Sequence, residues 1–444
     1  MRRPGWSAGG GYFRHHGWVL AFVVCTLFTA TAHATPPDVF GYGPRTQAMG
    51  MTGVAYADNY EAIYANPAGL GAQRNTGVAL GLQAGNFELK LDGERFALDS
   101  FNGSTIGLHI PLPFGGPLKD VIVIGAGFYT PSSTVLQTDI IFPETAQMAI
   151  LSRTQSVTVQ LGFGLNLDRA IPGLRVGFGV SALANIGGRL LVRLDETNQF
   201  ISQTETQLLA SFNPLIGFQL DIGDFTIGAV WRDKVRSDID LRIEVEDLPV
   251  EFPIITITAI PQFDPHVVAA ELAWRPSDHW MAALNLTYRR WSTYPGVVGR
   301  SSSNSNLPPA PDFRDTVSPR LGVEWRGTKR RTTGLLRFGY SYEMTPAPAA
   351  RMAPGRDSEG EDLLEDGSVV MRPVRYLDAD RHILTLGGGV HWESKIGLIV
   401  RLDLFGQLHR MVQRTHNIPS PGNTENLTTE GWVAVGGWAL NLDW

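Results

Sequence analysis

The sequence predicts an all-β protein, namely a closed 14-stranded antiparallel transmembrane β-barrel whose lumen holds an N-terminal hatch. Three observations lead to this prediction. Short segments of alternating apolar and polar residues recur through most of the 444 residues, their connections alternate between short and long, and a segment of small residues precedes the first of them. Soluble chains of this length usually divide into two or three domains, but no break in composition divides this one.

Residues 1–34 have the features of an export signal. Three arginines precede an apolar run over residues 18–30, and Ala32-His33-Ala34 matches the small-x-small pattern that signal peptidase cleaves. The apolar run is too short for a comfortable membrane anchor. Because the only cysteine, Cys25, lies in this run, we expect a mature chain that begins at Thr35 and has no disulfide and no cysteine-ligated metal site. No metal and no cofactor is predicted.

The charge and hydropathy of the chain argue against two other kinds of protein. The 37 basic and 43 acidic residues give a net charge of −6, which argues against a nucleic-acid partner. Beyond the export signal, no apolar run is long enough for a transmembrane helix. The mean hydropathy of −0.04 indicates a balance of apolar and polar residues, which alternation along strands produces.

Residues 35–75 are predicted to form a hatch, and residues 76–444 the barrel. The hatch segment is rich in glycine, alanine and asparagine-proline, and it has too few large side chains to build a core of its own. A barrel of fourteen strands encloses a lumen wider than its own side chains can fill. We therefore expect residues 35–75 to lie inside the barrel.

Fourteen segments show the alternation expected of strands that face lipid on one side. In residues 431–444, for example, Trp432, Leu440 and Trp444 share an apolar face, whereas Asn441 and Asp443 lie on the other. The predicted strands cover residues 76–85, 104–113, 120–130, 154–167, 174–190, 205–220, 223–232, 263–275, 280–291, 315–326, 332–343, 380–392, 397–410 and 431–444.

The connections between these segments alternate in length. Short turns include 221–223, 276–279, 327–331 and 393–396, and long links include 131–153, 232–262, 293–314, 344–379 and 411–430. A soluble sandwich could show the same alternation within a strand, so the even strand number and the loop asymmetry decide for a membrane barrel. Closure also has a physical reason, because every backbone group in a bilayer needs a partner within the sheet.

The glycines and the Asn-Pro-Ala element of the predicted hatch carry a family resemblance. The hatch residues concerned are Gly41, Arg45, Ala48, Gly50, Gly53, Ala55, Ala57, Asp58, Asn59, Asn66, Pro67 and Ala68. Together with a strand that ends in residues 125–131 and the terminal Trp444, they resemble the FadL-type outer-membrane transporters over essentially the whole mature chain. Met51 departs from the pattern, since relatives often have glycine there, and barrels of the same fold that serve secretion systems share a similar hatch.

The resemblance implies uptake of long-chain fatty acids or other hydrophobic compounds across the outer membrane of a Gram-negative bacterium, by a monomeric barrel that is not an enzyme. A chain of sixteen carbons prefers apolar surroundings by roughly 10 kcal/mol, at about 0.8 kcal/mol per methylene, so a water-filled pore would not serve it. Family members capture the compound at outer loops, shift the hatch and release the compound sideways where a strand is kinked.

The resemblance also implies roles for particular residues. The hatch and gating candidates are Arg45, Asn66, Pro67 and Ala68. Pro131 and Pro214 are candidates for strand kinks, because proline removes a hydrogen bond from the ladder. The candidate residues for substrate capture are Ile140, Ile141, Phe142, Met148, Ile150 and Leu151.

Three arginines face the predicted lumen. Arg320, Arg337 and Arg401 are candidates for binding a carboxylate head group. The alternative is that they pair with acidic residues across the lumen. Those acidic residues are Glu324, Glu343 and Asp403.

Two other functional classes stay open. An outer-membrane lipase or protease would need a nucleophile with its base, but no Ser/His/Asp set stands at a recognisable motif. A secretion-associated scaffold of the same fold would bind a protein partner and show no uptake. The acidic loop 357–366 could bind calcium or bridge lipopolysaccharide, yet its spacing is not that of an EF-hand, so a solvated loop is predicted. The expected partners are hydrophobic small molecules, outer-membrane lipid and lipopolysaccharide.

Overall fold

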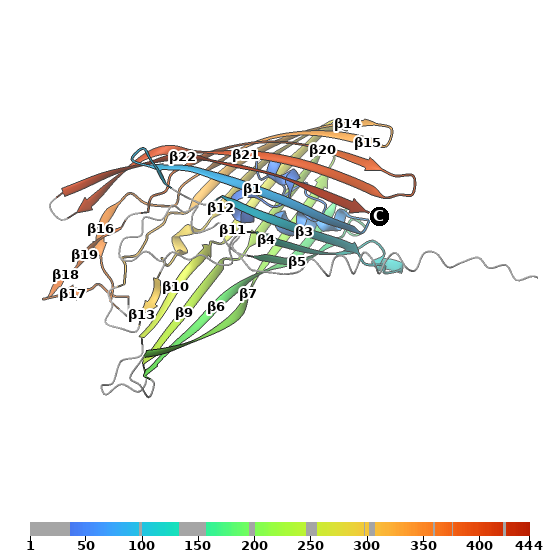
Figure 1. Cartoon of the computed structure of the whole chain (residues 1–444). Coiled ribbons are helices and arrows are strands. Elements are labelled where there is room, and N and C mark those ends of the chain that lie inside the picture. Colours follow the sequence, from blue (N-terminus) through green and yellow to red (C-terminus); the bar gives the residue numbers. More distant parts are fainter. Residues whose placement is uncertain are drawn as a thin grey trace, which may run out of the picture.

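The computed structural model describes residues 36–96, 100–132, 157–194, 200–245, 255–296, 298–301, 307–357, 360–374, 376–420 and 423–444. Fourteen strands in this part of the chain form one antiparallel ring, which is closed by pairing of the first strand with the last (Figure 1). The ring runs through β1 (Gly77–Leu91), β3 (Phe101–Pro111), β4 (Ile122–Pro131), β5 (Thr158–Asn166), β6 (Leu174–Leu194), β7 (Phe200–Ile222), β8 (Phe225–Arg232), β11 (Val267–Ser277), β12 (Trp280–Arg289), β14 (Thr316–Lys329), β15 (Thr332–Glu343), β20 (Arg381–Glu393), β21 (Ile399–Ser420) and β22 (Asn423–Asp443). The predicted closed 14-stranded barrel is confirmed.

The register of the closing pair follows from its apolar pattern. Strands β1 and β22 pair from Gly77 opposite Asp443 to Leu91 opposite Thr429. Because side chains alternate along a strand, a shift of one residue would turn the apolar side chains of one strand into the lumen. The observed register keeps Leu80 and Leu82 of β1 and Trp438 and Leu440 of β22 on the outer face, where each is at least 36% exposed.

Several strands are longer than the sequence predicts. Strand β21 continues to Ser420 and β22 begins at Asn423, so residues predicted as the long link 411–430 form a paired hairpin instead. Strands β6 and β7 are extended in the same way. The apolar alternation marks only the lipid-facing part of a strand, so it does not mark the parts of these hairpins beyond the apolar band.

Additional strands lie outside the ring. Strand β9 (Val235–Val245) runs parallel to the outer part of β6 and antiparallel to β10 (Ile255–Asp264), which pairs with β13 (Val298–Ser301). The predicted link 232–262 is therefore partly sheet. Shorter pieces are β2 (Glu94–Phe96) on β1, β16 (Arg351–Pro354) on β19 (Met371–Val374), and β17 (Leu364–Glu365) on β18 (Ser368–Val369).

The outer surface of the ring is an apolar band. Leu284, Leu336 and Leu386 are 55%, 61% and 65% exposed, which is unfavourable in water and expected against lipid. Aromatic residues border the band, with Trp274, Trp280, Trp325, Trp392 and Trp444 at the end with the short turns and Trp231, Tyr288 and Trp432 at the end with the long loops. Among the described residues, no helix has the length and apolar character needed to cross a bilayer.

Four short helices lie inside the ring and form the hatch. They are α2 (Pro36–Phe40), α3 (Pro44–Ala48), α4 (Ala62–Ala65) and the 3-10 helix η1 (Pro67–Ala72), drawn in blue in Figure 1. Helix α3 contacts β15, β20, β21 and β22, whereas η1 contacts β4 to β7. Phe40, Met49, Ile63 and Leu70 are fully buried, so hatch and wall share a packed interior.

Candidate functional site

The inner wall carries a belt of glycines where the hatch approaches it. A Cβ atom at Gly177 in β6 would overlap the backbone nitrogen of Ala68, and one at Gly217 in β7 would overlap the side chain of Asn66. Only glycine permits so close an approach. The glycine belt also includes Gly107, Gly125, Gly127, Gly164, Gly228, Gly322, Gly339 and Gly387. Inward-facing glycines in successive strands are the sequence signal for this belt, of which the family resemblance included only Gly125 and Gly127.

Asn66 joins the hatch to strand β7. Its side-chain nitrogen donates to the carbonyl groups of Val54 at 2.7 Å and Phe218 at 2.9 Å, and its oxygen accepts from the amide of Ala68 at 3.1 Å. The Ala68 bond caps η1, and Pro67 occupies the first position of this helix, where an amide hydrogen is not needed. The structure thus brings Asn66, Pro67 and Ala68 together at one attachment point.

Asn66→Ala is expected to loosen this attachment. The variant removes the acceptor of the buried Ala68 amide, at about 1–3 kcal/mol for an unsatisfied group, whereas the Val54 carbonyl keeps a donor in the side chain of Gln219 at 3.0 Å. Hydrogen exchange of the Ala68 amide in detergent should therefore be faster than in the wild type. Pro67→Ala keeps these hydrogen bonds and should exchange at nearly the wild-type rate. Normal insertion and unchanged oleate import by both variants would contradict a hatch role for this element.

Glu271 in β11 binds the hatch backbone directly. Its carboxylate accepts hydrogen bonds from the amides of Gly53, Val54 and Ala55 at 2.9 to 3.1 Å, and from the side chain of Asn285 at 3.0 Å. A carboxylate removed from water is stable only when its oxygens are bonded in this way. Glu271 is therefore a second attachment point, which the sequence analysis missed because alternation does not show what an inward residue contacts.

Arg45 joins the hatch to β14. Its guanidinium group binds both oxygens of Glu324, at 2.9 and 3.0 Å, and lies 4.9 Å from the ring of Tyr56. Glu324 also accepts from Arg337 at 2.8 Å, and Arg337 donates to Asp403 at 2.6 Å. A chain of charge-assisted hydrogen bonds thus runs from the hatch through β14 and β15 to β21.

The three arginines proposed as carboxylate-binding candidates are all ion-paired within the barrel. Arg320 lies 2.7 Å from Glu343, and Arg401 lies 2.9 Å from Asp443. Arg337 is bound as described above. Arg320 and Arg337 thus pair with the acidic residues that the alternative named, whereas Arg401 pairs with Asp443, which was not among them.

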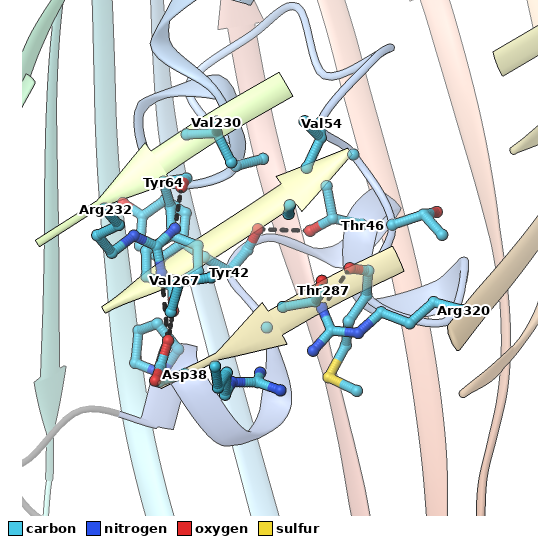
Figure 2. A pocket seen from close by; sticks show the side chains of 18 residues that line it. Asp38, Tyr42, Thr46, Val54, Tyr64, Val230, Arg232, Val267, Thr287 and Arg320 are labelled. Carbon is cyan, nitrogen blue, oxygen red and sulfur yellow. Dashed lines mark hydrogen bonds and ion pairs between the residues drawn. The ribbon is translucent and has the colours of Figure 1, made fainter. Parts of the chain in front are cut away.

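A cavity lies between the hatch and strands β8, β11, β12 and β14 (Figure 2). It contains about 550 Å³ of empty space, part of which is open to solvent. Val54 of the hatch, Val230 of β8, and Val267 and Ala269 of β11 form its apolar lining. An apolar lining with a few polar groups is typical of small-molecule sites.

Arg232, Asp38 and Tyr64 form the polar side of this cavity, as Figure 2 shows. The Arg232 guanidinium lies 3.2 Å from the Asp38 carboxylate, donates to the Tyr64 carbonyl at 2.6 Å and stacks 4.1 Å above the Tyr64 ring. The Tyr64 hydroxyl donates to the same carboxylate at 2.5 Å. Arg232 was not among the predicted site residues, although it stands at the inward-facing end of a predicted strand.

Five aromatic rings cluster on the long-loop side of the cavity. They belong to Phe263, Trp291, Tyr294, Phe313 and Tyr376, and neighbouring ring centroids are 4.8 to 6.5 Å apart. Phe263 shortly precedes the cavity residue Val267, and Trp291 shortly follows the cavity residue Arg289. This aromatic cluster therefore adjoins the ends of the strands that line the cavity.

The fold can be compared with known proteins. No protein-family model matches the chain, and no curated protein matches its sequence. A FadL homologue from Pseudomonas aeruginosa aligns with a TM-score of 0.54 at 13% identity, covering 90% of this chain and 97% of that one. The P. putida toluene transporter TodX aligns with a TM-score of 0.55 at 14% identity, covering 92% and 99%. The chain has the FadL-type fold.

Two predictions linked to the FadL-type fold remain predictions. Ile140, Ile141, Phe142, Met148, Ile150 and Leu151, the capture candidates, lie outside the described residues. Pro131 ends β4 opposite Gly103. Pro214 lies within β7 in unbroken register with Val180 of β6, and pairing with β8 begins at the next residue, Leu215. A kink at either proline is not tested by this register.

Glu61 joins two parts of the hatch, and we expect it to make the stability of the hatch sensitive to pH. Its buried carboxylate accepts hydrogen bonds from the amides of Arg45 at 3.1 Å and Thr46 at 2.9 Å. Burial raises the pKa of Glu61 from 4.5 to about 7, although these two bonds lower it. A raised pKa favours the protonated form in the docked hatch. The contribution of Glu61 to stability is therefore fully present below pH 4.5 and is lost as the pH rises through about 7.

We expect Glu61→Gln to reduce the loss of stability with rising pH. Through this carboxyl group, the wild type should lose about 3 kcal/mol between about pH 4 and about pH 8. Thermal unfolding followed by circular dichroism at both pH values measures the difference for each protein. The same decrease in Tm in the wild type and the variant would show that Glu61 does not control this dependence.

Proposed function

We propose that this protein is a FadL-type transporter that takes up hydrophobic compounds through the outer membrane of a Gram-negative bacterium. The observation that supports this best is the apolar cavity beside a hatch that fills a closed, lipid-facing barrel. In this proposal residues 1–34 are the export signal, 35–75 the hatch and 76–444 the barrel. The protein acts as a single barrel surrounded by phospholipid and lipopolysaccharide.

The proposed path follows the apolar surfaces of the protein. A compound is captured at the outer loops, passes the aromatic cluster and enters the cavity beside Val230 and Val267. Movement of the hatch then connects the cavity to an opening in the barrel wall, and the compound leaves into the membrane. At each step the apolar surface of the compound stays in contact with apolar surface of the protein or the membrane. Keeping that surface out of water is favourable by about 25 cal/mol per Å².

Two classes of cargo fit this path. Long-chain fatty acids are the cargo that the resemblance implies. Small neutral aromatic compounds are favoured by the aromatic cluster and by the charges of the cavity, since Arg232 faces Asp38, and Arg289 and Arg320 share Glu343. A fatty-acid carboxylate would have to compete with these protein carboxylates, whereas a neutral aromatic compound would not.

Uptake of labelled oleate and of toluene by cells with and without the protein tests the proposal. Ala269→Trp should fill the cavity and reduce uptake to the level of cells without the protein. Ala270→Trp is the matched control, because this neighbouring side chain faces lipid and should leave uptake unchanged. Equal uptake with and without the protein would contradict transport and favour the secretion-associated scaffold.

A further inference from the structure

Two neighbouring short turns carry a concentration of basic residues. The end of β14 carries Arg326 and Lys329, the β14–β15 turn carries Arg330 and Arg331, and the β20–β21 turn carries Lys395. These five residues, here termed the basic rim, are all exposed or half-exposed. The two turns are side by side, since the amide of Glu393 donates to the carbonyl of Arg331 at 2.9 Å. Figure 1 shows both hairpins at the end of the barrel that holds the C terminus.

The basic rim is mostly free of partners within the protein. Arg326 contacts Glu324 at 3.2 Å, but the other four side chains make no hydrogen bond or ion pair with the described part of the chain. Other short turns differ, since Arg169 donates to the carbonyl of Pro117 and Arg175 pairs with Asp221. These other turns and the strand ends beside them carry the basic residues Lys119, Arg169, Arg175 and Arg275 and the acidic residues Asp120, Asp168, Asp221, Asp224 and Asp278.

Large apolar side chains surround the basic rim. Trp280 of β12, Trp325 of β14 and Trp392 of β20 are 51%, 38% and 48% exposed on the lipid-facing side, and Ile396 at the tip of the β20–β21 turn is 88% exposed. Tryptophan side chains on a lipid-facing surface mark the level of the membrane interface. The hairpin closes tightly, with Lys329 paired to Thr332, so its cations lie near this level.

We propose that the basic rim binds the anionic head groups of phospholipids in the periplasmic leaflet of the outer membrane. This inference rests on the proposed location and orientation of the barrel. Unpaired lysine and arginine side chains at a membrane surface attract anionic lipid, and each contributes about a fivefold factor to binding. An acidic protein would match the charge, but it would leave Ile396 and the tryptophans without apolar contacts.

The test uses the full barrel in nonionic detergent micelles that contain phosphatidylglycerol or phosphatidylcholine, with bound lipid counted by native mass spectrometry. The rim variant combines Lys329→Gln, Arg330→Gln, Arg331→Gln and Lys395→Gln. Its matched control removes the same charge from exposed positions elsewhere, and combines Lys90→Gln, Lys119→Gln, Lys234→Gln and Arg410→Gln. Heat-dependent gel mobility confirms that both variants are folded barrels.

Wild type and control should bind more phosphatidylglycerol than phosphatidylcholine. In the rim variant this preference should be at least about tenfold weaker than in the wild type. An unchanged preference in the rim variant would overturn the proposal. Equal loss in the control would also overturn it, because net charge alone would then explain the binding. If the wild type bound soluble polyglutamate as tightly as it binds phosphatidylglycerol, the result would overturn the proposal and favour an acidic protein partner. Since lipid is counted directly, failure here leaves the uptake proposal untouched.

Discussion

Gly177→Val is expected to displace the hatch from the lumen while the barrel still inserts. A side chain at this position would overlap backbone atoms of Pro67 and Ala68, which cannot rotate aside as a side chain could. The pairing of β6 with β5 and β7 does not depend on this side chain. Limited proteolysis should therefore cut the hatch rapidly in the variant. Cells that carry the variant should also become sensitive to large antibiotics such as vancomycin.

Gly406→Val is the matched control for this effect. Gly406 lies on the lipid-facing side of β21, and the nearest atom to a Cβ there is 4.0 Å away. The control should resemble the wild type in proteolysis and in antibiotic sensitivity. A hatch that stays protected in Gly177→Val would show that the close approach at the glycine belt is not required for docking.

Glu271→Ala is expected to weaken docking through the loss of a buried acceptor. The amides of Gly53, Val54 and Ala55 and the side chain of Asn285 would lose their partner together. Removing one member of a buried charged network costs about 3–5 kcal/mol. Hydrogen exchange of these three amides in detergent should therefore accelerate by about 100-fold or more.

Two further variants at carboxylates make this test specific. Glu271→Gln keeps one acceptor oxygen and should give an intermediate acceleration. Glu88→Ala removes an exposed carboxylate whose described partner is the exposed Arg95, so its effect should stay within about 0.5 kcal/mol. Unchanged exchange in Glu271→Ala would show that other contacts hold this part of the hatch in place.

The ring of strands could be predicted from the sequence because lipid imposes a strict rule on it. Each strand in a bilayer must be apolar on the face that meets lipid. Because side chains alternate along a strand, apolar residues then recur at every second position, as in residues 431–444. The position of the hatch also followed from composition, since a wide lumen must be filled. Strands β9 and β10 obey no such rule, because they lie outside the ring, and the sequence analysis placed them in a loop.

The attachments of the hatch could be predicted only in part. Asn66, Pro67 and Arg45 were selected through the family resemblance, and the structure gives each a place at the hatch or its contact with the wall. Glu271 and Arg232 were missed because a charged residue at an inward position indicates only that it faces the lumen. Which hatch atom it meets depends on how the hatch sits against the wall, and no local pattern in the sequence carries that information.

The bonds that hold the hatch are distributed unevenly around the lumen. Hydrogen bonds and ion pairs join it to β1, β3, β7, β8, β11, β14, β15, β20 and β21, whereas toward β4, β5 and β6 it meets the wall largely through the glycine belt and apolar side chains such as Ile63 and Leu70. Hydrogen bonds depend on the distance and angle between their partners, so they keep the bonded side of the hatch in place. Van der Waals contacts have no such directional preference, so the other side separates from the wall more readily. The side of the hatch along β4 to β6 should therefore separate from the wall first, while the rest of the hatch stays attached.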